Sequence, residues 1–258
     1  MPIQLIDRRA LKCEAKELIR TAHVSPIRFT LFFFAIALVL DLIDSALTNI
    51  TDTGVSIAFL SVSFISILIA LIAEVLSAGY LCYCLGVHRR EHMPYESLFD
   101  SFAFAGKVIA LTIVEGIFVF LWSLLFLIPG IIALYRYSFA MWNLCADPSI
   151  GVMEALNRSK QQTRGYKWQL FVLQLSFIGW FILVGIAFSI YEALTLYLIS
   201  DTFAGILLGT ALYTVFTAAA EVYFKPYYTL SVGGFYLRAT TPYRADEGQN
   251  RSGYDPEF

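Results

Sequence analysis

The chain has 258 residues, of which 58% are hydrophobic and 15% are charged, and its formal net charge is −2. Soluble domains contain roughly 45–50% apolar and about 25% charged residues, so this composition excludes an ordinary soluble globular protein. The small net charge points to no particular partner. No basic stripe is interleaved with aromatic residues outside the apolar runs, so no nucleic-acid partner is expected.

Long apolar runs dominate the chain. A helix needs about 20 apolar residues to cross the hydrocarbon core of a bilayer, and five of the six runs reach that length. Backbone groups in lipid must be hydrogen-bonded internally, which favours helices. We therefore predict an all-α fold, a polytopic transmembrane helical bundle of about six membrane helices, as one domain over 1–238 followed by a disordered cytoplasmic tail over 239–258. The predicted spans are 29–48, 55–87, 108–128, 131–146, 168–191 and 203–224.

The basic residues lie on alternate connections between these runs. Of the 18 Lys and Arg residues, 17 lie before residue 29, at 88–107, at 147–167 or after residue 224. The connections without any basic residue are 49–54, 129–130 and 192–202. Cytoplasmic loops of membrane proteins collect Lys and Arg, so this pattern predicts a protein of the cytoplasmic (plasma) membrane with both termini in the cytoplasm. The one exception, Arg136, lies inside the fourth run.

The expected partners follow from the same distribution. The basic connections face the cytoplasmic leaflet, whose anionic headgroups attract them. The lipid bilayer is therefore the expected partner, and a protein partner of unknown identity is possible.

Three cytoplasmic segments share one plan: an amphipathic helix, a short basic anchor, and then an apolar run. The first covers 7–22, the second can begin at Pro94, and the third is predicted to start at Asp147-Pro148 and to end near Arg164. Such helices lie flat at the headgroup boundary with the apolar face inward, so we expect two to three interfacial helices. Their predicted apolar faces are Leu11, Ala15, Leu18, Ile19 and Ala22 in the first; Tyr95, Leu98, Phe99 and Phe102 in the second; and Val152, Met153, Ala155 and Leu156 in the third. This plan fits either a true three-unit repeat or convergence, because any cytoplasmic loop needs polar residues and a helix start.

Ionisable residues inside the apolar runs are the candidate functional residues. A charge at the bilayer centre costs about 2.5–3.5 kcal/mol on insertion scales, so it usually has a partner or a function. The candidate intramembrane polar site consists of Glu74, Glu115 and Arg136. From their depth along the predicted helices, at about 1.5 Å per residue, Glu74 and Arg136 are expected to pair, with Glu115 as the second acidic candidate. Such a pair either fixes the register of the helices or belongs to a substrate or proton path.

One short motif suggests metal chemistry. Residues 88–92, with His88, Glu91 and His92, match the H-x-x-E-H pattern of some zinc peptidases. A zinc site needs both imidazoles on one face of a stable helix, a glutamate base and a third ligand. Met93-Pro94 follows at once and no third ligand is evident, so we predict no metal, no cofactor and no catalytic residue. The sequence also lacks a G-x-x-x-x-G-K-[ST] phosphate loop.

The central part of the chain resembles a known family. The residues that carry the resemblance are Leu121-Trp122-Ser123-Leu124-Leu125-Phe126-Leu127-Ile128-Pro129-Gly130-Ile131-Ile132, Tyr135, Tyr137-Ser138, Met141, Ala146-Asp147-Pro148, Glu154-Ala155-Leu156, Arg158-Ser159, Gly165-Tyr166-Lys167-Trp168 and Leu175-Ser176-Phe177-Ile178-Gly179-Trp180-Phe181. A weaker match covers Leu98-Phe99-Asp100, Pro226-Tyr227 and Phe235-Tyr236. Together these resemble the bacterial multi-pass proteins grouped as domain of unknown function 975, which implies an integral membrane protein without an assigned activity. The chain departs from the expected pattern at Ala133-Leu134, where a Lys or similar residue is expected.

The sequence thus predicts a non-enzymatic membrane protein that acts by contact with the membrane or with a partner. Two alternatives remain open. A transporter of small molecules or lipids would use a polar path around Glu74, Glu115 and Arg136, and would need a hydrated cavity that reaches Glu74 or Arg136. A membrane-embedded enzyme would need turnover that depends on His88.

Overall fold

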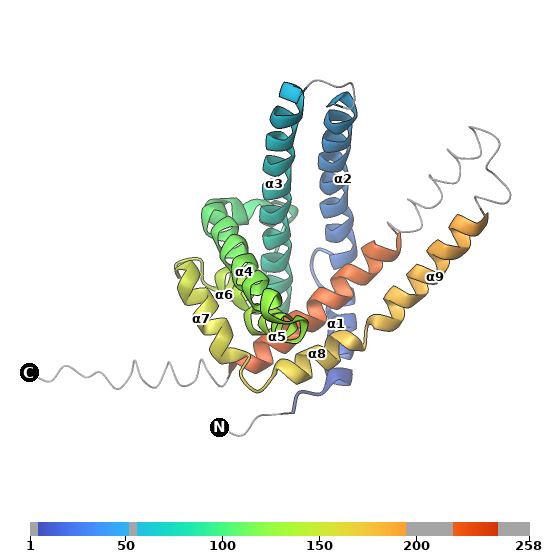
Figure 1. The fold of residues 1–258 in the computed structure, drawn as a ribbon. Helices are drawn as coiled ribbons and strands as arrows, with labels where there is room; N and C mark the ends of the chain where they lie inside the picture. Colours follow the sequence, from blue (N-terminus) through green and yellow to red (C-terminus); the bar gives the residue numbers. More distant parts are fainter. Residues whose placement is uncertain (1–4, 52–55, 195–218, 242–258) are drawn as a thin grey trace, which may run out of the picture.

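The computed structural model describes residues 5–51, 56–194 and 219–241, and within these ranges the chain forms helices and turns without a strand (Figure 1). The predicted all-α fold is confirmed. The helices are α1 (Arg8–Thr21), α2 (Pro26–Thr51), α3 (Ser56–His88), the 3₁₀ helix η1 (Tyr95–Phe104), α4 (Ala105–Leu125), α5 (Leu127–Tyr137), α6 (Ala140–Ala146), α7 (Val152–Gln162), α8 (Lys167–Leu175) and α9 (Ile178–Leu194). A last helix is described over 219–241, and we call it the C-terminal helix.

Several of these helices have the length and composition of membrane spans. Within the described residues, four stretches qualify: Pro26–Leu47, Ser63–His88, Tyr95–Leu125 and Lys167–Ile186. They overlap the predicted spans 29–48, 55–87, 108–128 and 168–191. Most of the predicted span 203–224 lies outside the described residues, as does most of the predicted tail. The C-terminal helix continues to residue 241, so the first three residues of that predicted tail are helical.

The predicted span 131–146 is divided in the structure. α5 ends at Tyr137 and α6 begins at Ala140, with a turn between them. The chain also changes direction at Phe126, before the connection expected at 129–130. Phe126 is extended, with φ −162° and ψ 153°, and Pro129 lies in the first turn of α5, where a proline needs no backbone N–H. Pro129-Gly130 is therefore part of a helix and not the turn between two spans.

The long helices form arms that leave a common core. Figure 1 shows α2 and α3 side by side, with α9 and the C-terminal helix leaving in another direction. The Trp180 and Phe224 rings stack at 5.8 Å between their centres and join this second pair. The outer parts of the arms expose large apolar side chains such as Leu42, Phe64 and Ile182, which are more than half exposed. Exposed apolar surface on this scale marks a contact with lipid or with another protein.

The core surrounds the last four turns of α3. Tyr80, Tyr83 and Leu85 are at most 1% exposed there. The ring of Phe29, at the start of α2, stacks on Tyr83 with 3.5 Å between ring centres. The hydroxyls of Thr30 and Tyr80 share a buried hydrogen bond of 2.8 Å. Since burying one large side chain contributes about 1.5–3 kcal/mol, this region holds the arms together.

The apolar face of α1 packs on protein. Leu11, Ala15 and Leu18 are buried. Lys12 Nζ donates to the carbonyl of Ser176, and Glu14 pairs with Arg238 at 2.8 Å. The apolar contact that the sequence assigned to lipid is therefore made with the end of α8 and with the C-terminal helix.

η1 packs antiparallel to α3, and Gly79 of α3 fixes how the two helices align. Ser101 Oγ donates to the carbonyl of Val75 at 2.8 Å, and a Cβ at Gly79 would collide with the carbonyl of Leu98. Three residues of a 3₁₀ helix rise about 6 Å, the same as four residues of an α-helix, so the two helices stay in step. The buried residues of η1 are Ser97, Leu98 and Ser101, and of its predicted apolar face only Leu98 is buried.

The three amphipathic segments pack in a cyclic order. α1 lies on α8 and the C-terminal helix, and η1 lies on α3. Helix α7 lies on α5 and α6, where the Ser159 hydroxyl donates to the carbonyl of Arg136. Each segment thus contacts the arm that precedes it, with the first contacting the last. This order favours the three-unit interpretation.

Candidate functional site

Two of the three predicted site residues lie together. Glu74 on α3 accepts a hydrogen bond of 3.0 Å from the hydroxyl of Thr112 on α4. Glu115, one turn further along α4, is close enough for its negative charge to repel that of Glu74. All three side chains are half-buried. Two carboxylates and a hydroxyl between two helices can hold a proton or a cation.

Arg136 lies elsewhere. Its carbonyl accepts hydrogen bonds from Ser159 at 2.9 Å and from Thr163 at 3.2 Å, both near the end of α7. Its guanidinium lies 5.9 Å from the centre of the Tyr137 ring, and its charge repels that of Lys167. None of the ion pairs between described residues includes Arg136, so the predicted pairing with Glu74 is not formed. Because α5 ends at Tyr137, Arg136 lies beside α7 and Lys167, with the other basic residues, and not at the depth of Glu74.

A small cavity reaches Arg136. It has a volume of about 260 Å³ and lies between the end of α4 and α5. Its lining is Trp122, Pro129, Ile132, Ala133 and Arg136. Glu74 and Glu115 do not line it, so it does not connect the predicted site residues.

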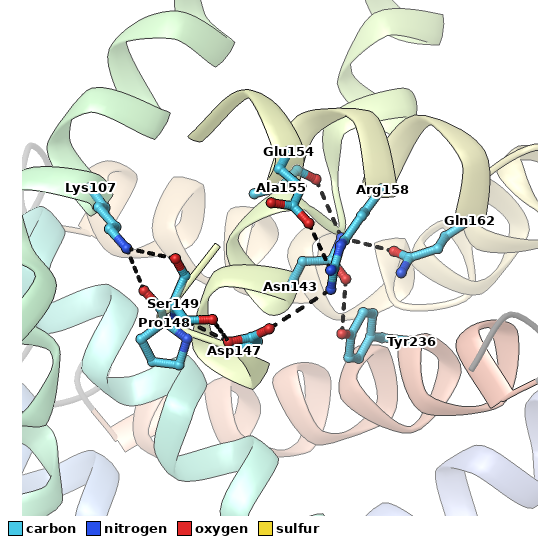
Figure 2. A network of polar contacts seen from close by, with 10 residues as sticks. All are labelled: Lys107, Asn143, Asp147, Pro148, Ser149, Glu154, Ala155, Arg158, Gln162 and Tyr236. Carbon is cyan, nitrogen blue, oxygen red and sulfur yellow. Dashed lines mark hydrogen bonds and ion pairs between the residues drawn. The ribbon is translucent and has the colours of Figure 1, made fainter. Parts of the chain in front are cut away.

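A polar network joins α4, α6, α7 and the C-terminal helix (Figure 2). Asp147 was predicted to cap the third helix, but α7 begins only at Val152, and Asp147 instead closes a turn. Its carboxylate accepts from the backbone N–H and the hydroxyl of Ser149. These hydrogen bonds, mainly the one from the Ser149 hydroxyl, hold the pKa of Asp147 below its usual range. Lys107 Nζ donates to the carbonyls of Pro148 and Ser149 at 2.6 and 3.2 Å and so fastens the turn to α4.

Arg158 extends this network along α7. It pairs with Glu154 at 2.7 Å, one turn away on the same helix, and lies 4.0 Å from Asp147. These groups are partly exposed, so each pair contributes little on its own. Their effect is to orient α7 relative to the turn.

The buried part of the network centres on Asn143. Its amide donates to Gln162 Oε1 at 2.8 Å, and its carbonyl oxygen accepts from the hydroxyl of Tyr236 at 3.0 Å. One side chain of α6 thus binds both α7 and the C-terminal helix (Figure 2). Sequence reasoning missed Asn143 and Gln162. The available signal was an amide inside the apolar run 131–146.

A comparison with protein families finds a match to the part of the chain that contains most of this network. Residues 124–241 match the family described as "Protein of unknown function (DUF975)". This part of the chain, 118 of the 258 residues, is therefore similar to that family. The DUF975 match contains Asn143, Asp147, Arg158 and Tyr236, so most of the network in Figure 2 lies within the family region. No curated protein and no solved structure matches the chain.

The side chains of the H-x-x-E-H residues are turned apart. His88 is the last residue of α3, and its Nε2 lies 2.7 Å from the carbonyl of Leu230. The ring of His92 contacts the ring of His23, with 3.9 Å between their centres. The two imidazoles therefore do not share a ligand site, and the described residues contain no group of three or more His, Cys, Asp or Glu that could hold a metal ion.

Proposed function

We propose that this protein is a non-enzymatic, multi-pass protein of the bacterial cytoplasmic membrane that acts through contacts of its core with lipid headgroups or a protein partner. The observation that carries the proposal is the division of its surface. The arms expose apolar side chains, whereas the basic residues belong to the core and its connections. Arg136, the exception in the sequence, supports the same division because it lies beside Lys167.

The use of the buried polar side chains supports a role without catalysis. Asn143, Gln162 and Tyr236 are bonded to one another, and Ser159 and Thr163 are bonded to the backbone of α5. The hydrogen bonds of these groups join neighbouring helices. A general acid or base must come within hydrogen-bond reach of its substrate, whereas these groups lie between packed helices.

Labelling of the exposed Cys13 on α1 tests the orientation. A membrane-impermeant maleimide should label Cys13 only after cells are permeabilised. Thr53→Cys, in the predicted outer connection and combined with Cys13→Ser, should be labelled in intact cells. Labelling of Cys13 in intact cells contradicts the proposed topology, and extraction of the protein by alkaline carbonate contradicts the membrane location.

Crosslinking at η1 tests the interaction role. Phe99 is 46% exposed, while its neighbour Leu98 is fully buried. A photoreactive amino acid at position 99 should give discrete lipid or protein adducts in cells, and the same group at position 98 should give only intramolecular ones. Identical patterns from both positions contradict a contact through this face.

One observation favours a transporter as the second candidate. Glu74, Thr112 and Glu115 face one another between α3 and α4, as a proton or cation path would require. A transporter predicts that Glu74→Gln and Glu115→Gln each abolish proton-coupled flux in vesicles while the protein still folds. The interaction role predicts that both variants keep their crosslinks at position 99.

A further inference from the structure

A cavity lies between the end of α1, the end of α3 and the connections that follow these two helices. Its volume is about 410 Å³, within the range of roughly 300–1,000 Å³ that small-molecule sites occupy. Three segments form it: the end of α1 with residues 22–24, the last turns of α3, and residues 90–93. It is separate from the Glu74 site and from the network of Figure 2.

The cavity has one apolar and one charged side. Leu18, Val24, Tyr83, Val87 and Met93 supply the apolar lining. The Tyr83 hydroxyl donates to the carbonyl of Val24 at 2.8 Å, so this phenol is already satisfied. A ligand that fills this side must therefore offer hydrocarbon.

The exposed rim carries one guanidinium, two imidazoles and one carboxylate. It consists of His23, Arg90, Glu91 and His92. The Glu91 carboxylate lies 3.8 Å from Arg89, which does not line the cavity, and this contact offsets its charge. Arg90 takes part in none of the ion pairs between described residues. An anionic group is the natural complement of this rim.

The backbone holds Arg90 in an uncommon conformation. Its φ is 57°, and it occupies the left-handed position after α3. The N–H of Arg90 donates to Val87 and that of Glu91 to Gly86, a helix ending in which this position usually belongs to glycine. An L-residue there is strained, because its Cβ comes close to the following carbonyl oxygen. Strain of this kind clusters at binding sites, where it positions a side chain.

The cavity lies where two apolar helices meet the polar part of the chain. Residues 22–24 of its lining precede Pro26, where one membrane-length stretch begins, and residues 90–93 follow His88, where the next one ends. We propose that this cavity binds the phosphate of an anionic phospholipid of the cytoplasmic leaflet. Arg90 and the two imidazoles contact the phosphate, and the first acyl carbons lie against Tyr83 and Met93. The inference rests on the proposed membrane location.

Binding of short-chain phosphatidylglycerol to the full-length protein in a zwitterionic detergent tests this assignment. Saturable binding is expected, with phosphatidylcholine of the same chain length and inorganic phosphate each binding at least about 10-fold more weakly. Arg90→Gln should weaken binding of phosphatidylglycerol about 10-fold or more, because a charge-assisted contact is lost. The matched control Arg9→Gln, at an exposed arginine that does not line the cavity, should change it less than about threefold, and His23→Gln is a second variant on the rim.

Three results of these experiments would contradict the lipid site, each for a different reason. Equal effects of Arg90→Gln and Arg9→Gln would mean general attraction to basic residues and would overturn the site. Inorganic phosphate that binds as tightly as the lipid would show a free anion as the ligand. Loss of the membrane location in the carbonate test rejects the proposed function, whereas failure of binding in a protein that stays in the membrane rejects this inference alone.

Discussion

Arg90 combines a conformational cost with a position at the rim of a cavity. Arg90→Gly removes the steric cost of the left-handed conformation and should raise the free energy of unfolding by about 1 kcal/mol. Thermal unfolding in detergent without added lipid measures this effect. The control Arg89→Gly, at a residue without a positive φ, should leave stability unchanged or lower it. A lower unfolding temperature for Arg90→Gly would show that its side chain contributes more than the strain costs.

Asp147 gives a pH dependence with a defined sign. Its folded-state pKa lies below the ordinary value of 3.8, mainly because the Ser149 hydroxyl bonds to its carboxylate. A carboxylate with a depressed pKa stabilises the folded state above its unfolded pKa, and this contribution is lost as the pH falls through the folded pKa. The difference in unfolding temperature between the wild type and Asp147→Asn should therefore be constant above about pH 5 and should shrink below pH 4. A difference that grows on acidification contradicts the turn geometry.

At the level of elements, the contact between η1 and α3 depends on Gly79. Gly79→Ala places a methyl group against the carbonyl of Leu98, and such overpacking costs roughly 1–3 kcal/mol. Gly116→Ala on α4 is the matched control, because a Cβ there meets nothing within 4 Å and alanine favours a helix over glycine by up to about 1 kcal/mol. Thermal unfolding should separate the two variants in opposite directions. Equal behaviour would mean that η1 does not pack closely on α3.

The positions of the helices along the chain could be predicted from the sequence better than the contacts between helices. Apolar runs and amphipathic periods depend on residues close in the chain, so α1 and the long apolar helices were predictable. The partner of Arg136 was inferred by counting residues along one straight helix, and the turn at Ser138 and Phe139 invalidates that count. The approach of Glu74 to Glu115 depends on how α3 and α4 cross, which no local pattern encodes.

The face of η1 was mispredicted for a different reason. The expected stripe assumed 3.6 residues per turn, whereas η1 has about three. Its buried side is also selected by Gly79, which admits only a close backbone and small side chains such as Ser97 and Ser101. Tyr95, Phe99 and Phe102 are left on the outside.

At the scale of the whole molecule, Asn143 connects parts of the chain that are distant in sequence. Asn143→Ala removes the hydrogen bonds that Asn143 makes to Gln162 and to the Tyr236 hydroxyl, and the loss of a buried hydrogen bond costs about 1–3 kcal/mol. Tyr236→Phe alone should cost less, because it removes a donor and not the central amide. In a double-mutant cycle measured by unfolding, the two substitutions should show an interaction energy of about 0.5–3 kcal/mol. Additive effects would mean that α6 and the C-terminal helix are not coupled through this contact.

The cyclic packing has a consequence for biosynthesis. Glu14 of α1 pairs with Arg238, 224 residues later in the chain. At roughly 5–20 residues per second, the ribosome needs about 11–45 s to produce that partner. During this interval Leu11, which lies against Gly234, lacks the C-terminal helix that covers it, and the headgroup layer next to the first inserted arm is the nearest apolar surface for an amphipathic helix. The first helix to be made, α1, is thus the last to complete its packing. In a chain that is truncated before the C-terminal helix, the apolar face of α1 stays uncovered at Leu11.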